Sequence, residues 1–123
     1  MVQFTATRPI FVQISELIGV RIMTGAYPPG SKLASVRDLA TELGVNPNTV
    51  QRALVDLEAQ GLITTHRTIG RTVTEDESAI ADGRQLLVKQ RVQDFVESLR
   101  PFNYRPDDLC DILRTCMKEE EAT

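Results

Sequence analysis

The apolar positions of residues 9–61 recur at the three-to-four-residue spacing of an α-helix in three successive stretches. The first stretch covers residues 9–24, the second residues 36–43 and the third residues 47–60. Their apolar sides consist of Phe11, Ile14, Leu17, Ile18 and Ile22; of Val36, Leu39, Ala40 and Leu43; and of Val50, Ala53, Leu54 and Leu57. Because each helix has one apolar side to bury, the pattern predicts a three-helix core in which the first helix packs across the other two.

A short turn joins the second and third predicted helices. Ser35 is placed to cap the second helix with Asp38 as its capping partner, and Gly44 supplies the left-handed residue that ends it. Asn46 caps the third helix, and Pro47 occupies its first position, where proline is favoured. Two helices joined by a turn of about three or four residues that contains Gly form a helix-turn-helix.

The outer face of the third helix carries hydrogen-bonding side chains. At about 100° per residue, Asn48 and Arg52 point directly away from the apolar side. Thr49 and Gln51 lie on the flanks of that face. Asn and Gln can bind adenine through two hydrogen bonds, Arg can bind guanine in the same way, and the first turns of a recognition helix meet base edges in the major groove. The alternative interpretation is an ordinary polar face in contact with solvent.

After Gly61 the spacing of the apolar residues changes from about 3.6 to about two. Residues 62–66 and 71–74 are rich in β-branched side chains, and residues 67–70 form the reversal between them, which predicts a β-hairpin. A three-helix core followed by a hairpin is a winged helix. Arg67 and Arg71 then bring positive charge within reach of phosphates or of the minor groove. Taken by itself, an Arg pair on a hairpin also fits a role in solubility.

Residues 77–123 predict two further amphipathic helices, which Pro101 separates. About 45 residues is near the lower limit for independent folding, so the apolar sides of these helices need another surface to cover them. We therefore predict a homodimer formed through residues 78–118; the alternative is a monomer whose helices fold back on their own winged helix. The predicted interface residues are Val88, Val92, Phe95, Leu99, Leu109, Ile112 and Leu113.

The net charge of −3 argues weakly against nucleic acid as a partner, but the charge is unevenly distributed. Residues 1–75 carry seven Lys or Arg against six Asp or Glu, whereas residues 76–123 carry seven against eleven. The basic residues of the first part gather around the predicted helix-turn-helix and wing, at Lys32, Arg37, Arg52, Arg67 and Arg71. Local charge at the contact surface decides phosphate binding, rather than the total.

Composition and apolar runs indicate a globular protein without a membrane span or a signal peptide. The 123 residues fit one domain or a small domain with an appendage, and 41% apolar and 25% charged residues are ordinary for a globular protein. No apolar run approaches the length of a membrane span, and the first residues lack a signal-peptide core. We therefore expect a cytoplasmic protein with no membrane partner.

The residues that carry most enzyme and metal chemistry are sparse. Cys110 and Cys116 are six residues apart, a spacing that suits neither a disulfide nor a paired metal site, and we predict that both are buried packing residues. His66 has no Cys or His neighbour at ligand spacing. No catalytic triad, paired catalytic carboxylates or phosphate-binding Gly loop is visible, so we predict no metal, no cofactor and no enzyme activity.

Several spaced features of residues 9–76 agree with one known family: Pro9-Ile10-Phe11, Pro29-Gly30, residues 33–37, residues 45–49 and the hairpin after Gly61. The stretch PIFVQISELIGVRIMTGAYPPGSKLASVRDLATELGVNPNTVQRALVDLEAQGLITTHRTIGRTVTED resembles the amino-terminal domain of GntR-family transcriptional regulators. Within that family, VNPNTVQRAL and RTIGRTVTED resemble the YtrA-type subfamily, whose members have a short carboxy-terminal part and are often linked to transporter operons. The resemblance implies a winged helix-turn-helix DNA-binding domain in residues 9–76. Together with the two predicted helices of residues 77–123, a short dimerisation region, this gives a mainly α fold with a small β-hairpin.

Carried over by position, the resemblance implies DNA contacts from Arg37, Asn48, Thr49, Gln51, Arg67, Thr68 and Gly70. Asn46, Arg52 and Arg71 complete the predicted set. The chain departs from the family at Ala34, where Pro is usual, and at Pro47, which is often Arg and therefore supplies no base contact here. The wing also lacks the usual Gly-x-Gly-Thr-Phe ending and instead contains Ile69-Gly70-Arg71-Thr72-Val73.

The sequence thus predicts a dimeric, sequence-specific regulator that binds double-stranded DNA, in the form of a repressor on a palindromic operator. The resemblance to YtrA-type members implies a transporter operon as one candidate target. The alternative is a winged-helix module for protein–protein contact in a larger assembly, which would be expected to show apolar anchors on the third helix. The sequence leaves no room for the sizeable ligand domain of larger family members. An effector at the dimer interface would change the spacing of the wings, but no residue identifies such a ligand.

Overall fold

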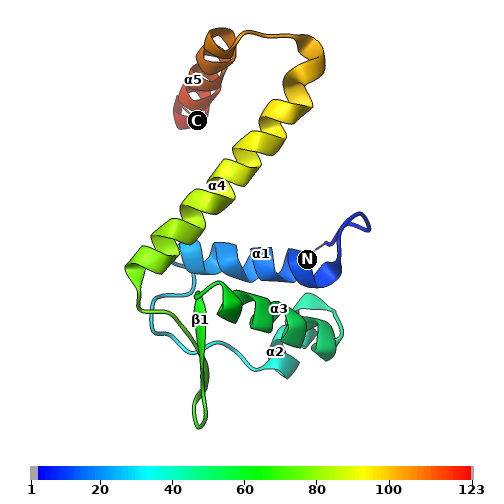
Figure 1. The fold of residues 1–123 in the computed structure, drawn as a ribbon, viewed down its shortest axis with the longest axis vertical. Coiled ribbons are helices and arrows are strands. Elements are labelled where there is room, and N and C mark those ends of the chain that lie inside the picture. The colour runs from blue at the N-terminus through cyan, green and yellow to red at the C-terminus, as the bar shows by residue number, and fades with distance from the viewer. Residues whose placement is uncertain (1–2, 123) are drawn as a thin grey trace. The chain divides into compact units, whose positions relative to one another are not determined.

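A computed structural model describes residues 3–122, which form mostly helices and one two-stranded sheet (Figure 1). The elements in chain order are α1 (Ile10–Met23), α2 (Val36–Leu43), α3 (Pro47–Ala59), β1 (Ile63–His66), β2 (Gly70–Val73), α4 (Glu77–Leu99), a 3-10 turn (Arg100–Phe102) and α5 (Pro106–Ala122). The chain divides into two compact units, one ending at Leu86 and the other beginning at Leu87. The predicted fold class, a mainly α winged helix with a small hairpin, is confirmed.

The predicted caps define the helix-turn-helix. The Ser35 hydroxyl accepts a hydrogen bond from the Asp38 backbone N–H at 3.1 Å, so α2 begins where the capping pattern placed it. Gly44 ends α2 with φ of +68°, a left-handed conformation that favours glycine. The Asn46 side chain accepts from the Asn48 N–H at 2.8 Å, and Pro47 takes the first position of α3.

The core of the first unit lies where α1, α2, α3 and the hairpin meet. Its largest fully buried side chains are Ile14, Ile18, Ile22, Leu39, Val50, Leu54, Leu57, Leu62 and Val73. Figure 1 shows the three helices grouped together, with the hairpin projecting from them. The core therefore holds α3 by its apolar side and leaves its polar side outward.

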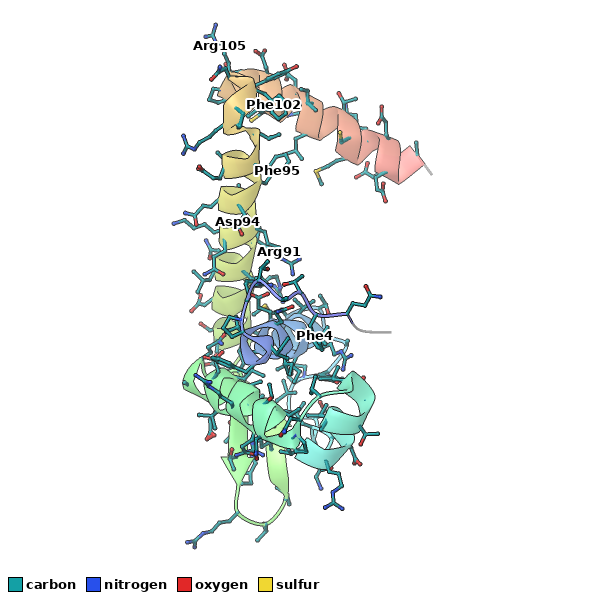
Figure 2. The ribbon with its side chains drawn as sticks, turned by 90° about the vertical axis from the view of Figure 1, so that its right-hand side faces the viewer. Phe4, Arg91, Asp94, Phe95, Phe102 and Arg105 are labelled. Carbon is teal, nitrogen blue, oxygen red and sulfur yellow. The ribbon has the colours of Figure 1, made fainter. Side chains whose placement is uncertain are left out.

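The residues before α1 are tied to its first turns. Gln13 is buried, and its side chain accepts from the Thr5 N–H at 2.9 Å and donates to the carbonyls of Thr5 at 2.8 Å and Arg8 at 3.0 Å. Arg8 also pairs with Glu16 at 2.7 Å. Phe4, labelled in Figure 2, packs half-buried against the core. These contacts hold the beginning of α1 firmly.

The hairpin has a regular register and a third neighbour. Ile63 pairs with Val73 and His66 pairs with Gly70, so the second strand begins at Gly70, one residue before the predicted position. Gly70 has φ of +90°, which the turn requires. Lys32 pairs with Thr72 on the outer side of β2. The hairpin is therefore joined to the segment that leads into α2.

The first turns of α4 belong to the winged-helix unit. Ile80 is buried in its core. A Cβ added at Gly83 would lie 3.1 Å from the Met23 Cε atom, so the helix runs close to the end of α1. The Arg84 guanidinium donates to the Met23 carbonyl from Nε at 3.1 Å and from Nη2 at 2.9 Å. The sequence pattern had placed the boundary at residue 76, whereas the compact unit extends to Leu86.

Gly19 lies on α1 where this helix packs against α3, and replacing it with Ala should stabilise the protein. An added Cβ would lie 3.7 Å from both the Leu57 Cδ2 and the Met23 Cε atoms, which is ordinary van der Waals contact. Ala is favoured over Gly inside a helix, so we expect Gly19→Ala to raise the free energy of unfolding by about 0.5–1 kcal/mol. Urea unfolding followed by circular dichroism would measure this change.

The matched control for Gly19→Ala is Gly44→Ala, because the same side chain is added at a residue with φ of +68°. The left-handed conformation should make that variant less stable by about 1–2 kcal/mol. A loss of stability for Gly19→Ala would show that α1 and α3 pack too closely for a methyl group.

The second unit consists of the rest of α4, the 3-10 turn and α5. Cys110 and Cys116 are both exposed, so the prediction that they are buried is wrong for the single chain. Each lines an apolar groove between the two helices rather than a closed core. Within residues 3–122, no helix is long and apolar enough to cross a membrane. No cluster of His, Cys, Asp and Glu able to hold a metal ion occurs in the same residues.

Candidate nucleic-acid interface

The outer face of α3 presents amide side chains to solvent. Asn48 and Gln51 are exposed, and neither side chain makes a hydrogen bond to another described residue. Thr49, between them, is half-buried. Free amide groups on the first two turns of the second helix of a helix-turn-helix are the groups that can pair with base edges.

Asn46 has a different position from the other predicted contacts. Its side-chain oxygen is already used as the cap of α3, since it accepts from the Asn48 N–H. The amide N–H donors of Asn46 remain available for a phosphate or a base acceptor. The sequence predicted that Asn46 both caps α3 and contacts DNA, and the structure shows the capping role.

The arginines of the first unit fall into two groups. Arg21 bonds the Tyr27 hydroxyl at 2.6 Å and the Glu42 carboxylate at 3.1 Å, Arg8 pairs with Glu16, and Arg84 donates to the Met23 carbonyl. In the part of the chain that the structure describes, no hydrogen bond or ion pair engages the guanidinium groups of Arg37, Arg52, Arg67 and Arg71. These four are the arginines that the sequence assigned to DNA.

Arg52 contacts a residue that sequence reasoning had placed only in the core. The Cζ atom of Arg52 lies 3.9 Å from the centroid of the Phe11 ring, which extends from the first turn of α1. Arg52 is exposed, as expected, but it leans toward α1. Nothing in the helical spacing of either residue indicates this contact, because it joins two helices far apart in the sequence.

The wing and the start of α2 share a polar groove of about 610 Å³. Thr68, Gly70 and Arg71 line one side of it, and Lys32 and Ser35 line the other. Arg71 is half-buried, with its Nε atom covered and without a hydrogen-bond partner among the described residues. Lys32 was missing from the predicted contacts, although its place in the basic cluster of the sequence was a signal for it.

Arg37 and Arg67 lie outside this groove at exposed positions. Arg37 is in the first turn of α2, and Arg67 begins the turn between the strands. The wing is also fixed to α3, because the Thr65 hydroxyl donates to the Glu58 carboxylate at 2.8 Å. The structure therefore places the predicted contacts on α2, α3 and the wing of one unit.

The predicted dimer residues form an apolar surface on the second unit. Val88, Val92 and Phe95 on α4 are each at least half exposed, and Ile112 and Leu113 on α5 are nearly so. Leu99 and Leu109 are half-buried. Two grooves, of about 510 and 480 Å³, run between the helices, and Phe95 lines both. Figure 2 labels Phe95 near the end of α4 and Phe102 in the 3-10 turn that follows it.

Three helices and a hairpin in this arrangement define a winged helix-turn-helix, the class of fold found in many DNA-binding transcription regulators. Residues 11–73 match the family described as bacterial regulatory proteins, gntR family. The chain is 34% identical to the HTH-type transcriptional repressor YtrA of Bacillus subtilis (strain 168) over 92 residues, which cover 74% of this chain and 71% of YtrA.

Solved structures give the same result. A GntR family transcriptional regulator from Listeria monocytogenes superposes with a TM-score of 0.84 at 36% identity, covering 91% of this chain and 98% of that one. AraR(DBD) in complex with operator ORX1 superposes with a TM-score of 0.56 at 28% identity, covering 60% and 95%. The chain therefore belongs to the gntR family and is a transcription regulator with a winged-helix DNA-binding domain. The predicted likeness to YtrA-type members is confirmed, and this family consists of regulators rather than enzymes.

Proposed function

We propose that this protein is a dimeric repressor that binds a palindromic operator, and that it acts in the cytoplasm by occupying the DNA. The observation that carries this proposal is the contrast among its arginines. In the first unit, the guanidinium groups on α2, α3 and the wing have no hydrogen-bond or ion-pair partner within the described residues, whereas those of Arg8, Arg21 and Arg84 are engaged. Two similar proteins support it: YtrA is a transcriptional repressor, and AraR(DBD) was crystallised in complex with an operator.

The side chains divide into two roles. Asn48 and Gln51 are in the first turns of α3 with free amide groups, which suit adenine edges in a major groove. Arg37 lies on α2, and Arg67 and Arg71 lie on the wing, where guanidinium groups suit phosphates or the minor groove. Phosphate contacts supply affinity and register, and base contacts supply specificity.

The second unit supports the dimeric part of the proposal. Apolar side chains such as Phe95 and Val92 are about half exposed in the single chain, and a second copy would cover them. One winged helix reads only a few base pairs, whereas a twofold dimer reads two half-sites and gains effective concentration. A monomer at micromolar concentration in sedimentation experiments would contradict this part.

The proposal can be tested by selecting bound sequences from random duplex DNA with the purified protein. We expect enrichment of a palindrome whose two half-sites have a fixed spacing. If no duplex is preferred over competitor DNA at moderate ionic strength, the proposal is wrong. Enrichment of an unrepeated short site would retain specific binding and exclude the twofold arrangement.

Two substitutions separate base contacts from phosphate contacts. Gln51→Ala should cost about 1–3 kcal/mol of binding free energy at the operator and relax the preference at one base position. Arg67→Ala should weaken binding to all sequences alike and lower the slope of log K against log salt by about one unit. Fluorescence anisotropy with the operator, its single-base variants and random DNA would measure both effects.

The two variants are controls for each other, because both change an exposed residue of the first unit. If both bind operator and random DNA as the parent does, the assignment of the α3 face and the wing is wrong. If Arg67→Ala alters the preference at one position, the wing reads bases as well.

A further inference from the structure

We infer that Phe11 is a positioning residue of the DNA interface, which holds the Arg52 guanidinium for contact with a backbone phosphate rather than with a base. The inference rests on the proposed function, since it concerns how the same surface meets DNA. It changes the role predicted for Arg52 and adds Phe11, a residue that sequence analysis assigned only to the core.

The geometry of the contact leaves the donors of Arg52 available. With Cζ 3.9 Å from the ring centroid, the cation lies close over the face of Phe11. A guanidinium that stacks on a ring uses its flat face, while its five N–H donors lie along its edge. Within the described chain, no hydrogen bond or ion pair engages that edge. Arg52 is therefore held in place without losing its capacity to bind an oxyanion.

The Phe11 ring, on which Arg52 stacks, is itself held in place. It is half-buried and packs against the core. Two residues further along α1, Gln13 fixes the preceding segment with hydrogen bonds to Thr5 and Arg8. The ring is thus held by its packing against the core, so Phe11 loses little further conformational entropy when Arg52 stacks on it.

The direction of Arg52 sets it apart from the base-reading side chains. One turn further along α3, Asp56 accepts from the Ser15 hydroxyl of α1 at 2.6 Å, so this flank of α3 faces α1. Glu58 bonds Thr65 of the hairpin, so another flank faces the wing. Gln51 is displaced from Arg52 by about 100° around the helix. Arg52 therefore lies toward the α1 margin of the outer face of α3.

The margin of a groove-binding helix meets the sugar–phosphate backbone, whereas its centre meets base edges. To reach a base, Arg52 would have to leave the ring and give up the stack. To reach a phosphate, it needs only its free edge. The stack thus favours the backbone contact, in which a planar guanidinium binds phosphate through two parallel hydrogen bonds.

The test is a double-mutant cycle in DNA affinity, with Phe11→Leu, Arg52→Ala and the two combined, measured on the operator selected as above. Arg52→Ala should weaken binding about tenfold for the operator and all its single-base variants, because a charge-assisted hydrogen bond is lost. The salt slope should fall by about one unit. Phe11→Leu should weaken binding about twofold to fivefold, again uniformly, and should have no further effect when combined with Arg52→Ala.

Two conservative variants distinguish positioning from mere support of the fold. Phe11→Tyr keeps the ring and should bind as the parent does. Arg52→Lys keeps the charge but loses the planar stack, and should fall between the parent and Arg52→Ala. Thermal unfolding of Phe11→Leu reports any loss of fold, and the Arg52 variants test the inference independently because they change no core residue.

The outcomes separate this inference from the proposed function. If the parent prefers no duplex, the proposed function fails. If the parent is specific but Arg52→Ala changes the preference at one base position, Arg52 reads a base and the inference is wrong. It is also wrong if Phe11→Leu weakens binding equally with and without Arg52→Ala, since the ring would then act through something other than Arg52.

Discussion

Replacing Phe95 with Asp should convert the proposed dimer to a monomer and abolish tight binding to the proposed palindromic operator. Phe95 is half exposed and lines both apolar grooves of the second unit, so a second copy that covers this surface would bury it. A carboxylate at the centre of an apolar interface would be desolvated without a partner. Because the two half-sites would no longer be bound together, operator affinity should fall about 100-fold or more.

Sedimentation at micromolar concentration measures the oligomeric state of the variant. Fluorescence anisotropy with a full operator and with a single half-site measures its DNA affinity. Half-site affinity should not change, because the winged-helix unit ends before Phe95.

Gln93→Glu is the matched control: it adds a negative charge to an exposed polar position of the same helix and should leave the dimer intact. Ile112→Asp, on α5, should behave as Phe95→Asp does. Dimers that persist in both aspartate variants would contradict the proposed interface.

Leu57→Ala should lower the free energy of unfolding of the winged-helix unit by about 2–5 kcal/mol. Leu57 is fully buried on α3, with its Cδ2 atom near Gly19 of α1. Removal of this side chain leaves a cavity between two helices, which cannot close the gap without losing their other contacts. For a unit of this size, Tm should fall by roughly 10 °C or more.

Val55→Ala is the control for Leu57→Ala. Val55 lies two residues earlier on the same helix but is 56% exposed, so its truncation should change the free energy of unfolding by no more than about 0.5 kcal/mol. Below its unfolding transition, Leu57→Ala should retain the parent's sequence preference, because Leu57 does not face outward. Equal effects of the two substitutions on stability would mean that the packing of α1 on α3 is not as described.

The winged helix could be predicted closely because its signals are local. Ser35 and Asn46 cap helices through backbone groups two or three residues away, and Gly44 adopts its left-handed conformation at the place where the periodic pattern stops. The hairpin followed from alternating β-branched residues, with errors of one residue at the start of β1 and at both ends of β2. Each of these features depends on a few neighbouring positions.

The candidate site was predicted less completely, since its members were identified one helix at a time. The exposed positions of Asn48 and Gln51 follow from helical spacing and are present in the structure. The contact of Arg52 with Phe11, and the approach of Lys32 to the wing, join segments that no periodicity relates. The buried cysteines were predicted from average burial, which does not apply to helices whose apolar sides are uncovered in the single chain.

The sequence by itself determined the type and limits of most helices and strands, and which side of each is apolar, because capping, turn conformation and hydrophobic period act within a few residues. Only the tertiary structure decided which guanidinium groups of the first unit have hydrogen-bond or ion-pair partners among the described residues and which do not. It also decided that the first turns of α4 join the winged-helix unit, where Arg84 reaches the Met23 carbonyl across 61 residues of sequence. Such contacts depend on how the helices pack in space. Packing joins residues that are far apart in the sequence, so local patterns in the sequence do not predict these contacts.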